Sequence, residues 1–151
     1  MQWQVLTFSE LTTHTLYDLL KLRVDVFVVE QQCAYPELDE KDRHSETRHV
    51  LLRDDNGSLI AYSRILAPTV SYPEASIGRV AIAHAGRGKG LAFELMARSI
   101  DIAQACWPNQ GIQIGAQDYL RQFYQKVGFI PCSEVYLEDG IPHLDMRYQL
   151  R

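Results

Sequence analysis

The sequence has few cysteines and no long apolar run, and both shortages argue against whole classes of protein. Three cysteines occur in 151 residues, Cys33, Cys106 and Cys132, and no two of them form a CxxC pair. This odd and scattered set argues against a disulfide framework or a zinc site and is typical of free thiols in a reducing compartment. No window has the apolar length of a membrane span, and the start, MQWQVLTFSE, lacks the basic and apolar regions of a secretory signal. We expect a cytoplasmic protein with no membrane partner.

Basic residues are also in short supply. Lys and Arg number 15 against 19 Asp and Glu, so the chain has no overall basic field that could hold a polyanion. We therefore expect no nucleic-acid partner. Hydrophobic residues make up 46% of the composition, which is enough for one core at this length, and we expect a single domain over residues 1–151. No spacing of histidines and cysteines predicts a metal site.

Hydrophobic periodicity in the first half predicts a strand, a helix and three more strands. Residues 3–8 are strand-like, and Ser9 is a candidate cap for a helix that ends near residue 30. The acidic stretch 31–46 is expected to be mainly a solvated loop. Three strand-rich runs follow, with an Asn-Gly hairpin signal between the first two, at residues 49–54, 59–66 and 75–82.

The second half continues the alternation. A helix is expected over 87–107, a strand over 112–116 and a helix over 118–127. Two closing strands, 129–138 and 141–150, surround an Asp-Gly hairpin signal. The β-α-β order around the first of these helices predicts a right-handed crossover between parallel strands. The fold class is therefore α/β, or α+β with a mixed sheet.

A glycine-rich turn opens the helix expected at 87–107. In the segment HAGRGKGLAFELMAR, three glycines alternate with Arg87 and Lys89. The first turn of a helix exposes unpaired N–H groups, and glycines let a phosphate approach the backbone closely. The alternative is a solvated turn. A P-loop is excluded because Ala83 and Gly90 stand at two required positions, and a dinucleotide fingerprint because Leu91 and Phe93 stand where its third glycine belongs.

Two motifs resemble those of a known family. The pattern Arg-x-x-Gly-x-Ala, spelled by Arg87, Gly90 and Ala92, resembles the acetyl-coenzyme A signature of the GNAT N-acetyltransferases. FYQKVGF, residues 123–129, is similar to the Tyr-x-x-x-Gly-Phe segment of the same family. Four further segments resemble its small bacterial ElaA-like branch, RVDVFVVEQQCAYPELDEKD, IGRVAI, GAQDYLRQFYQKVGFIP and VYLEDGIPH.

The resemblance implies a GNAT-like acyl-CoA N-acyltransferase fold, in which the central parallel strands 75–82 and 112–116 splay apart around acetyl-CoA. It places the pantetheine arm beside backbone groups of Val80, Ala81 and Ile82. It places the pyrophosphate on backbone N–H groups of the turn, from Arg87, Gly88, Lys89, Gly90, Leu91 and Ala92. Gln117 stands where many family members have a cofactor-binding Asn.

Acetyl transfer to an amine needs a base that deprotonates the amine and an acid that protonates the leaving thiolate. The resemblance identifies Tyr124 as the acid; the alternative is an aromatic core residue. Glu30 and His143 are the leading candidates for the base, followed by Asp39 and His49. Each of these could instead have a purely structural role.

Two arginines in strand-rich runs, Arg64 and Arg79, would be costly to bury unpaired. They would either bind an acceptor's carboxylate or pair with acids for structure. The resemblance favours an N-acetyltransferase that uses acetyl-CoA without a metal and acts by direct attack of a primary amine of a small molecule or peptide. The alternatives are a non-catalytic acetyl-CoA sensor and a tRNA-acetylating toxin. A homodimer formed through exposed sheet edges also stays open.

Overall fold

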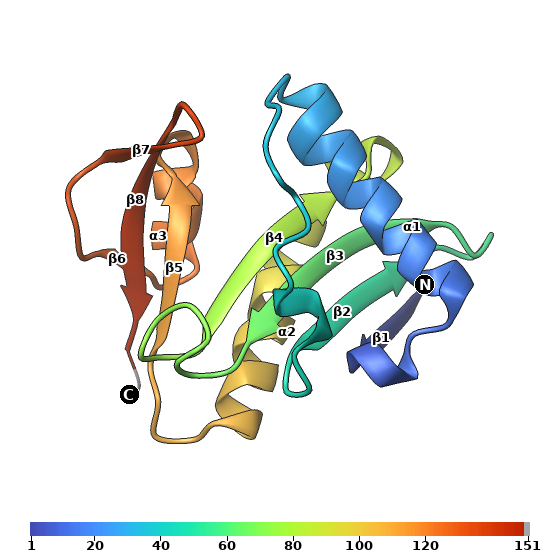
Figure 1. Ribbon diagram of the computed structural model, residues 1–151, viewed down its shortest axis with the longest axis horizontal. Helices are drawn as coiled ribbons and strands as arrows, with labels where there is room; N and C mark the ends of the chain where they lie inside the picture. Colours follow the sequence, from blue (N-terminus) through green and yellow to red (C-terminus); the bar gives the residue numbers. More distant parts are fainter. Residues whose placement is uncertain (150–151) are drawn as a thin grey trace.

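The computed structural model describes residues 1–149 as two antiparallel sheets (Figure 1). The first sheet has the order β1-β2-β3-β4, with bounds Gln2–Leu6, Arg48–Arg53, Leu59–Leu66 and Ser76–Ile82. The second has the order β5-β8-β6, with β7 also paired to β8, and its strands are β5 Ile112–Gln117, β6 Ile130–Pro131, β7 Tyr136–Glu138 and β8 Ile141–Tyr148. The hairpin signals at Asn56-Gly57 and Asp139-Gly140 connect the strand pairs that they predicted.

The sequence predicted one mixed sheet in which strands 75–82 and 112–116 pair in parallel, and this pairing is reduced to a single bridge. All pairs between named strands are antiparallel, and β4 meets β5 only through one parallel bridge, Ala75 with Ile112. The Gln113 N–H donates to the Ala75 carbonyl there at 2.9 Å. Beyond the bridge the two strands move apart, and β5 pairs over its full length with β8 instead (Figure 1).

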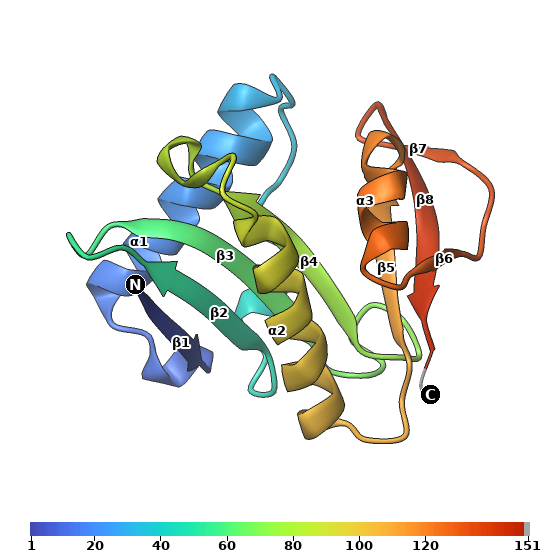
Figure 2. The same ribbon diagram turned by 180° about the vertical axis from the view of Figure 1, so that it is seen from behind.

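Two main helices cover opposite faces of the first sheet. Helix α1, Thr13–Val24, packs on one face and continues into a π-helical turn over Asp25–Glu30, and α2, Leu91–Cys106, packs on the other (Figures 1 and 2). The short helix α3, Arg121–Lys126, lies beside β5. Short 3-10 turns occupy Phe8–Glu10, Lys41–Arg43, His84–Gly86 and Asp118–Leu120.

Local chemistry explains where the helices begin. The Thr12 hydroxyl, rather than the expected Ser9, caps α1 by accepting from the Thr15 N–H at 3.1 Å. Helix α2 begins at Leu91, later than expected, because Gly88 and Gly90 have left-handed backbones with φ of +79° and +74°. Leu150, the last residue of the expected final strand, lies outside the described residues.

A buried ion-pair network attaches the segment after α1 to the first sheet. The fully buried Arg23 of α1 donates to Glu37 through Nε at 2.6 Å and to Asp42 through Nη1 at 2.7 Å. Arg64 of β3 binds both oxygens of Asp39 at 2.8 Å and reaches Asp42 at 3.0 Å. The expectation of a solvated acidic loop is therefore wrong, because these carboxylates are the counterions of buried arginines.

Replacing Arg23 by Met should destabilise the protein strongly. The change leaves Glu37 and Asp42 buried without their main cation, and breaking such a pair costs about 3–5 kcal/mol of the free energy of unfolding. Urea denaturation measures this loss. The control is Lys21→Met on the same helix, which breaks an exposed pair with Asp25 and should cost less than about 1 kcal/mol. Equal losses in the two variants would contradict the structural importance of the network.

The network should also make the fold acid-sensitive. Burial raises the pKa of Asp39, but the hydrogen bonds and charge of Arg64 outweigh it and hold that pKa at about 2. The folded state therefore binds this proton less readily than the unfolded chain, and the stabilisation present above about pH 4 is lost as the pH falls toward 2. Thermal melting across this range should show that Asp39→Asn has a shallower loss than the parent, whereas the exposed control Asp101→Asn keeps the parent's slope.

Candidate functional site

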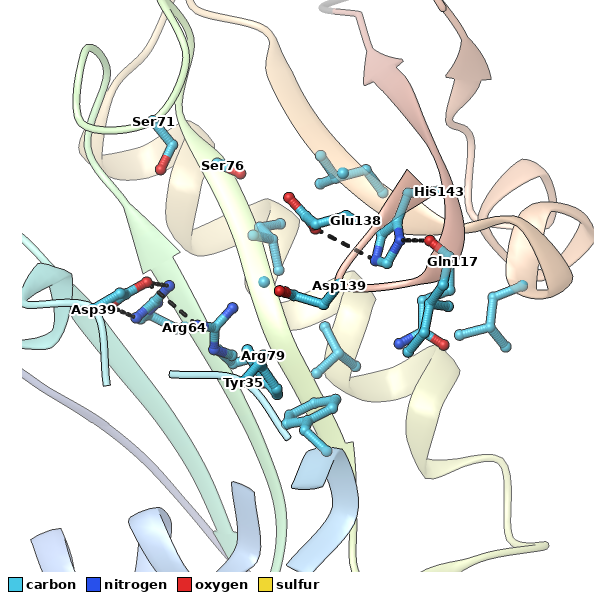
Figure 3. A pocket seen from close by; sticks show the side chains of 18 of the residues that line it. Tyr35, Asp39, Arg64, Ser71, Ser76, Arg79, Gln117, Glu138, Asp139 and His143 are labelled. Atoms are coloured by element: carbon cyan, nitrogen blue, oxygen red, sulfur yellow. Dashed lines mark hydrogen bonds and ion pairs between the residues drawn. The ribbon is translucent and has the colours of Figure 1, made fainter. Parts of the chain in front are cut away.

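A cavity of about 520 Å³ lies between the two sheets. Its walls come from β4, β5, α3, the segment after α1, the loop before β4 and the β7–β8 hairpin. Figure 3 shows several of these side chains converging from both sheets. Seven of the candidate residues named from the sequence line it, namely Asp39, Arg64, Arg79, Val80, Gln117, Tyr124 and His143. Residues that are distant in the sequence thus share one cavity because β4 and β5 separate beyond their single bridge.

Tyr124 is a buried phenol with an aromatic setting. It lies on α3 and is 8% exposed, with edge-on rings of Phe123 and Phe129 at centroid distances of 5.1 and 6.0 Å. Burial raises the pKa of Tyr124 to about 12, and the phenol of Tyr119 adds to this effect. Within residues 1–149 its hydroxyl has no hydrogen-bond partner. Tyr124 therefore keeps its proton at neutral pH and has it free to donate into the cavity.

His143 has one ring nitrogen occupied and one available. Its Nδ1 donates to the Ile141 carbonyl at 2.7 Å, because a carbonyl can only accept. In the neutral ring Nε2 then carries the lone pair, and it lies 3.5 Å from a carboxylate oxygen of Glu138 (Figure 3). The Tyr136 ring stacks on the imidazole at 6.2 Å. This arrangement holds one tautomer, with Nε2 able to accept a proton.

The glycine turn forms an open cradle of donors at the end of β4. A Cβ built on Gly88 or Gly90 meets no atom within 4 Å. None of the backbone N–H groups from Gly88 to Phe93 has an acceptor within the described residues 1–149. These unpaired groups and the positive end of the α2 dipole fit an anion such as a pyrophosphate. The fit follows from the open space at Gly88 and Gly90 and from the unpaired N–H groups.

Glu30 lies beside this turn rather than in the cavity. Both of its oxygens pair with the Arg87 guanidinium, one of them at 2.6 Å from Nη2. The hydrogen bond from Arg87 lowers the pKa of Glu30, which weakens it as a proton acceptor. Arg87 also donates through Nε to the Ile82 carbonyl at 3.1 Å, so the pair holds the π-helical turn after α1 against the end of β4.

The other candidate bases are committed to structural contacts. His49 is fully buried between the Tyr62 hydroxyl, 2.7 Å from Nδ1, and the Asp42 carbonyl, 3.1 Å from Nε2. Burial lowers its pKa, so the ring is neutral, with Nε2 donating and Nδ1 accepting. Asp39 lines the cavity, but both of its oxygens bind Arg64.

The remaining cofactor-site candidates lie along β4 and at the end of β5. Ala81 is buried and pairs with Tyr62, and Ile82 pairs with Ala61, so their strand bonds on that side are with β3. Gln117 donates from Nε2 to the Gln31 side chain at 3.3 Å. Within residues 1–149, the edge of β4 that faces β5 has no strand partner beyond the bridge at Ala75.

The sequence reasoning missed a β-bulge and the hairpin wall. The β3–β4 register shifts between Tyr62 and Arg64, and Arg79 has a left-handed backbone with φ of +52°. No sequence signal marked this shift, because Arg rarely adopts that conformation. Glu138 and Asp139 also line the cavity, and the Asp-Gly hairpin signal located this turn but not its proximity to β4.

Comparisons with known proteins agree with this architecture. Residues 17–150 match the acetyltransferase (GNAT) domain family. Protein ElaA of Escherichia coli K12 is 44% identical over 146 residues, which cover 97% of this chain and 95% of ElaA. The chain belongs to the GNAT acetyltransferase family.

Two solved structures agree over almost the whole chain. An acyl-CoA N-acyltransferase from Pseudomonas aeruginosa has a TM-score of 0.92 and 41% identity, covering 98% of this chain and 99% of that one. Escherichia coli ElaA has a TM-score of 0.91 and 42% identity, covering 99% and 100%. The chain is thus an ElaA-like member with a GNAT acyl-CoA N-acyltransferase fold, and the family implies acyl transfer from an acyl-CoA. None of the helices in residues 1–149 is long and apolar enough to cross a membrane.

A carboxylate at the glycine turn should abolish cofactor binding. Gly90→Glu adds a side chain and a negative charge to the donor cradle, and we expect acetyl-CoA affinity to fall by at least about tenfold, as measured by calorimetry. Gly57→Glu is the matched control, because Gly57 also has a left-handed backbone, with φ of +82°, and open space around it, but lies in the β2–β3 hairpin. Unchanged acetyl-CoA affinity in the Gly90 variant would contradict the assignment of this turn to the pyrophosphate.

Proposed function

We propose that the protein is an N-acetyltransferase that moves an acetyl group from acetyl-CoA to a primary amine of a small molecule or peptide by direct attack. One observation carries the proposal. A single cavity is lined by the phenol of Tyr124 and the imidazole of His143, and the open N–H groups of the α2 turn lie at the end of the strand that borders it.

The cofactor would bind along the open edge of β4. The N–H groups of the turn, from Gly88 to Ala92, would hold the pyrophosphate, and Lys89 would add a positive charge. The Arg87 N–H, expected to belong to this set, donates instead to the His84 carbonyl at 3.3 Å. Backbone groups of Val80, Ala81 and Ile82 would lie along the pantetheine arm, between strands that splay apart. Gln117 would hold the arm from the β5 side. When bound, acetyl-CoA supplies a thioester whose carbonyl the acceptor amine attacks, with departure of the coenzyme thiolate.

Two residues would then carry out the proton transfers. His143 Nε2 takes a proton from the acceptor's ammonium group, because an alkylamine with a pKa near 10.4 is almost wholly protonated at neutral pH. Its Nδ1 bond to the Ile141 carbonyl keeps Nε2 available for this step. Tyr124 donates its hydroxyl proton to the leaving sulfur, and the raised pKa keeps that proton in place until negative charge develops there. The acylated nitrogen then loses its second proton to the Tyr124 phenolate, which restores the phenol. His143 is favoured over Glu30, which is paired with Arg87 outside the cavity.

The test is thiol release from acetyl-CoA across polyamines, amino acids, aminoglycosides and short peptides. We expect acceptor-dependent release in the parent. Tyr124→Phe should keep cofactor affinity and lower kcat by about 100-fold, because it removes only the donated proton. Tyr17→Phe is the control, since Tyr17 is an exposed phenol on α1. Unchanged turnover in Tyr124→Phe would reduce Tyr124 to a packing role.

The base is tested separately. His143→Gln keeps a polar side chain of similar reach but has no ring nitrogen that can accept a proton, and we expect kcat to fall by about 100-fold. If His143 accepts the proton, the loss should shrink at high pH, where more of the acceptor amine is already neutral. A loss that is equal at pH 7 and pH 10 would contradict this role.

A further inference from the structure

The two walls of the cavity carry opposite charge. Its lining cations, Lys41, Arg64 and Arg79, belong to the first sheet and the segment packed on it. The β7–β8 hairpin contributes Glu138 and Asp139 and no cation to the lining. Figure 3 shows Arg79 and Arg64 on one side and Glu138 and His143 on the other. A ligand in this cavity thus has a cationic wall on one side and an anionic wall on the other.

Arg79 is held in place by hydrogen bonds, but some of its N–H donors remain free. Its Nε donates to Glu37 at 3.1 Å, and its Nη2 reaches the Glu37 carbonyl at 3.1 Å and Asp39 at 3.3 Å. Its Nη1 has no hydrogen-bond partner within residues 1–149, and the side chain is 22% exposed. The guanidinium is therefore fixed by buried acids while two of its N–H donors stay available to a ligand.

Further donors lie on the same wall. Lys41 Nζ binds only the Ser71 hydroxyl, at 2.7 Å, and has no carboxylate partner within the described part of the chain. The Ser76 hydroxyl at the start of β4 also lines the cavity, and it has no hydrogen-bond partner among residues 1–149. An ammonium and a guanidinium with free donors are the groups that suit a carboxylate.

The carboxylates of this wall cancel the charge of its arginines but not that of Lys41. Arg23, Arg64 and Arg79 carry three positive charges, and Glu37, Asp39 and Asp42 carry three negative ones, so the network is neutral and Lys41 adds one positive charge. On the hairpin, the Glu138 carboxylate has His143 as its ion-pair partner, and the Asp139 carboxylate has no cation partner within residues 1–149. These acids are free to hold an ammonium group beside His143 Nε2.

We infer that the acetyl acceptor is a small zwitterion that carries a primary amine and a carboxylate, as an amino acid does; the inference rests on the proposed function. The carboxylate binds Arg79 Nη1 and Lys41 Nζ. The ammonium group lies at the hairpin wall, where His143 deprotonates it. Arg79 and Lys41 thus determine the specificity for the acceptor, whereas Tyr124 and His143 donate and accept the protons of the acetyl transfer.

The first experiment compares matched acceptors that differ only in the carboxylate. An amino acid, its carboxamide and the corresponding amine without the carboxyl group are titrated by calorimetry into the protein saturated with coenzyme A, and each is then assayed for thiol release from acetyl-CoA. We expect the amino acid to bind at least about tenfold more tightly than the other two and to have the highest kcat/KM.

Two variants then test the anchor. Lys41→Met removes a side chain that has no ion pair, and Arg79→Lys keeps the charge but loses the planar fork. In each, KM and Kd for the amino acid should rise by about tenfold or more, while KM for the carboxamide stays constant. Lys126→Met is the matched control, because Lys126 is exposed on α3 and lines no part of the cavity.

The outcomes separate this inference from the proposed function. Carboxylate-dependent binding without thiol release would support the carboxylate anchor at Arg79 and Lys41 but overturn the proposed transfer, and with it the role of the zwitterion as acetyl acceptor. Thiol release that is equally efficient with and without the carboxylate would overturn the inference and leave the transferase intact. Equal weakening of amino acid and carboxamide by Lys41→Met would assign that lysine a structural role and likewise contradict the inference.

Discussion

The buried pairing of Arg23 with Glu37 and Asp42 is the constraint on which the cavity depends. A fully buried guanidinium is tolerated only when several acceptors surround it, and those acceptors lie in the irregular segment that follows α1. Because Arg23 needs these acceptors, residues 37–42 lie against the first sheet. The same carboxylates then bind Arg64 and Arg79, so one neutral network attaches the segment and immobilises a wall of the cavity.

The second constraint is the division of the strands into two sheets. Within residues 1–149, β4 and β5 pair only at the bridge between Ala75 and Ile112, and β4 keeps an open backbone edge beyond it. The resulting space gathers side chains that are far apart in the sequence, such as Arg79, Tyr124 and His143. At its end, the glycine turn leaves the first N–H groups of α2 unpaired.

Local signals were predictable from the sequence where the chemistry is local. The Asn-Gly and Asp-Gly turns, the helix that follows the glycine turn and the position of Tyr124 about one turn before the glycine that ends α3 all depend on neighbouring residues, although α2 begins at Leu91 and not at residue 87. The fate of the acidic stretch was not predictable in this way. Glu37 and Asp42 resemble solvated loop residues until Arg23 is placed opposite them, and Glu30 resembles a possible base until Arg87 occupies both of its oxygens.

The sequence by itself determined the family, the order of helices and strands, and the glycine turn, because each depends on residues at short and regular spacing. Only the tertiary structure decided which acids are counterions, which histidine has a free nitrogen, and which cations face the cavity. His49 and His143 are equivalent as letters in a sequence. They differ because His49 is enclosed by Tyr62 and the Asp42 carbonyl, whereas His143 Nε2 has only the Glu138 carboxylate beside it.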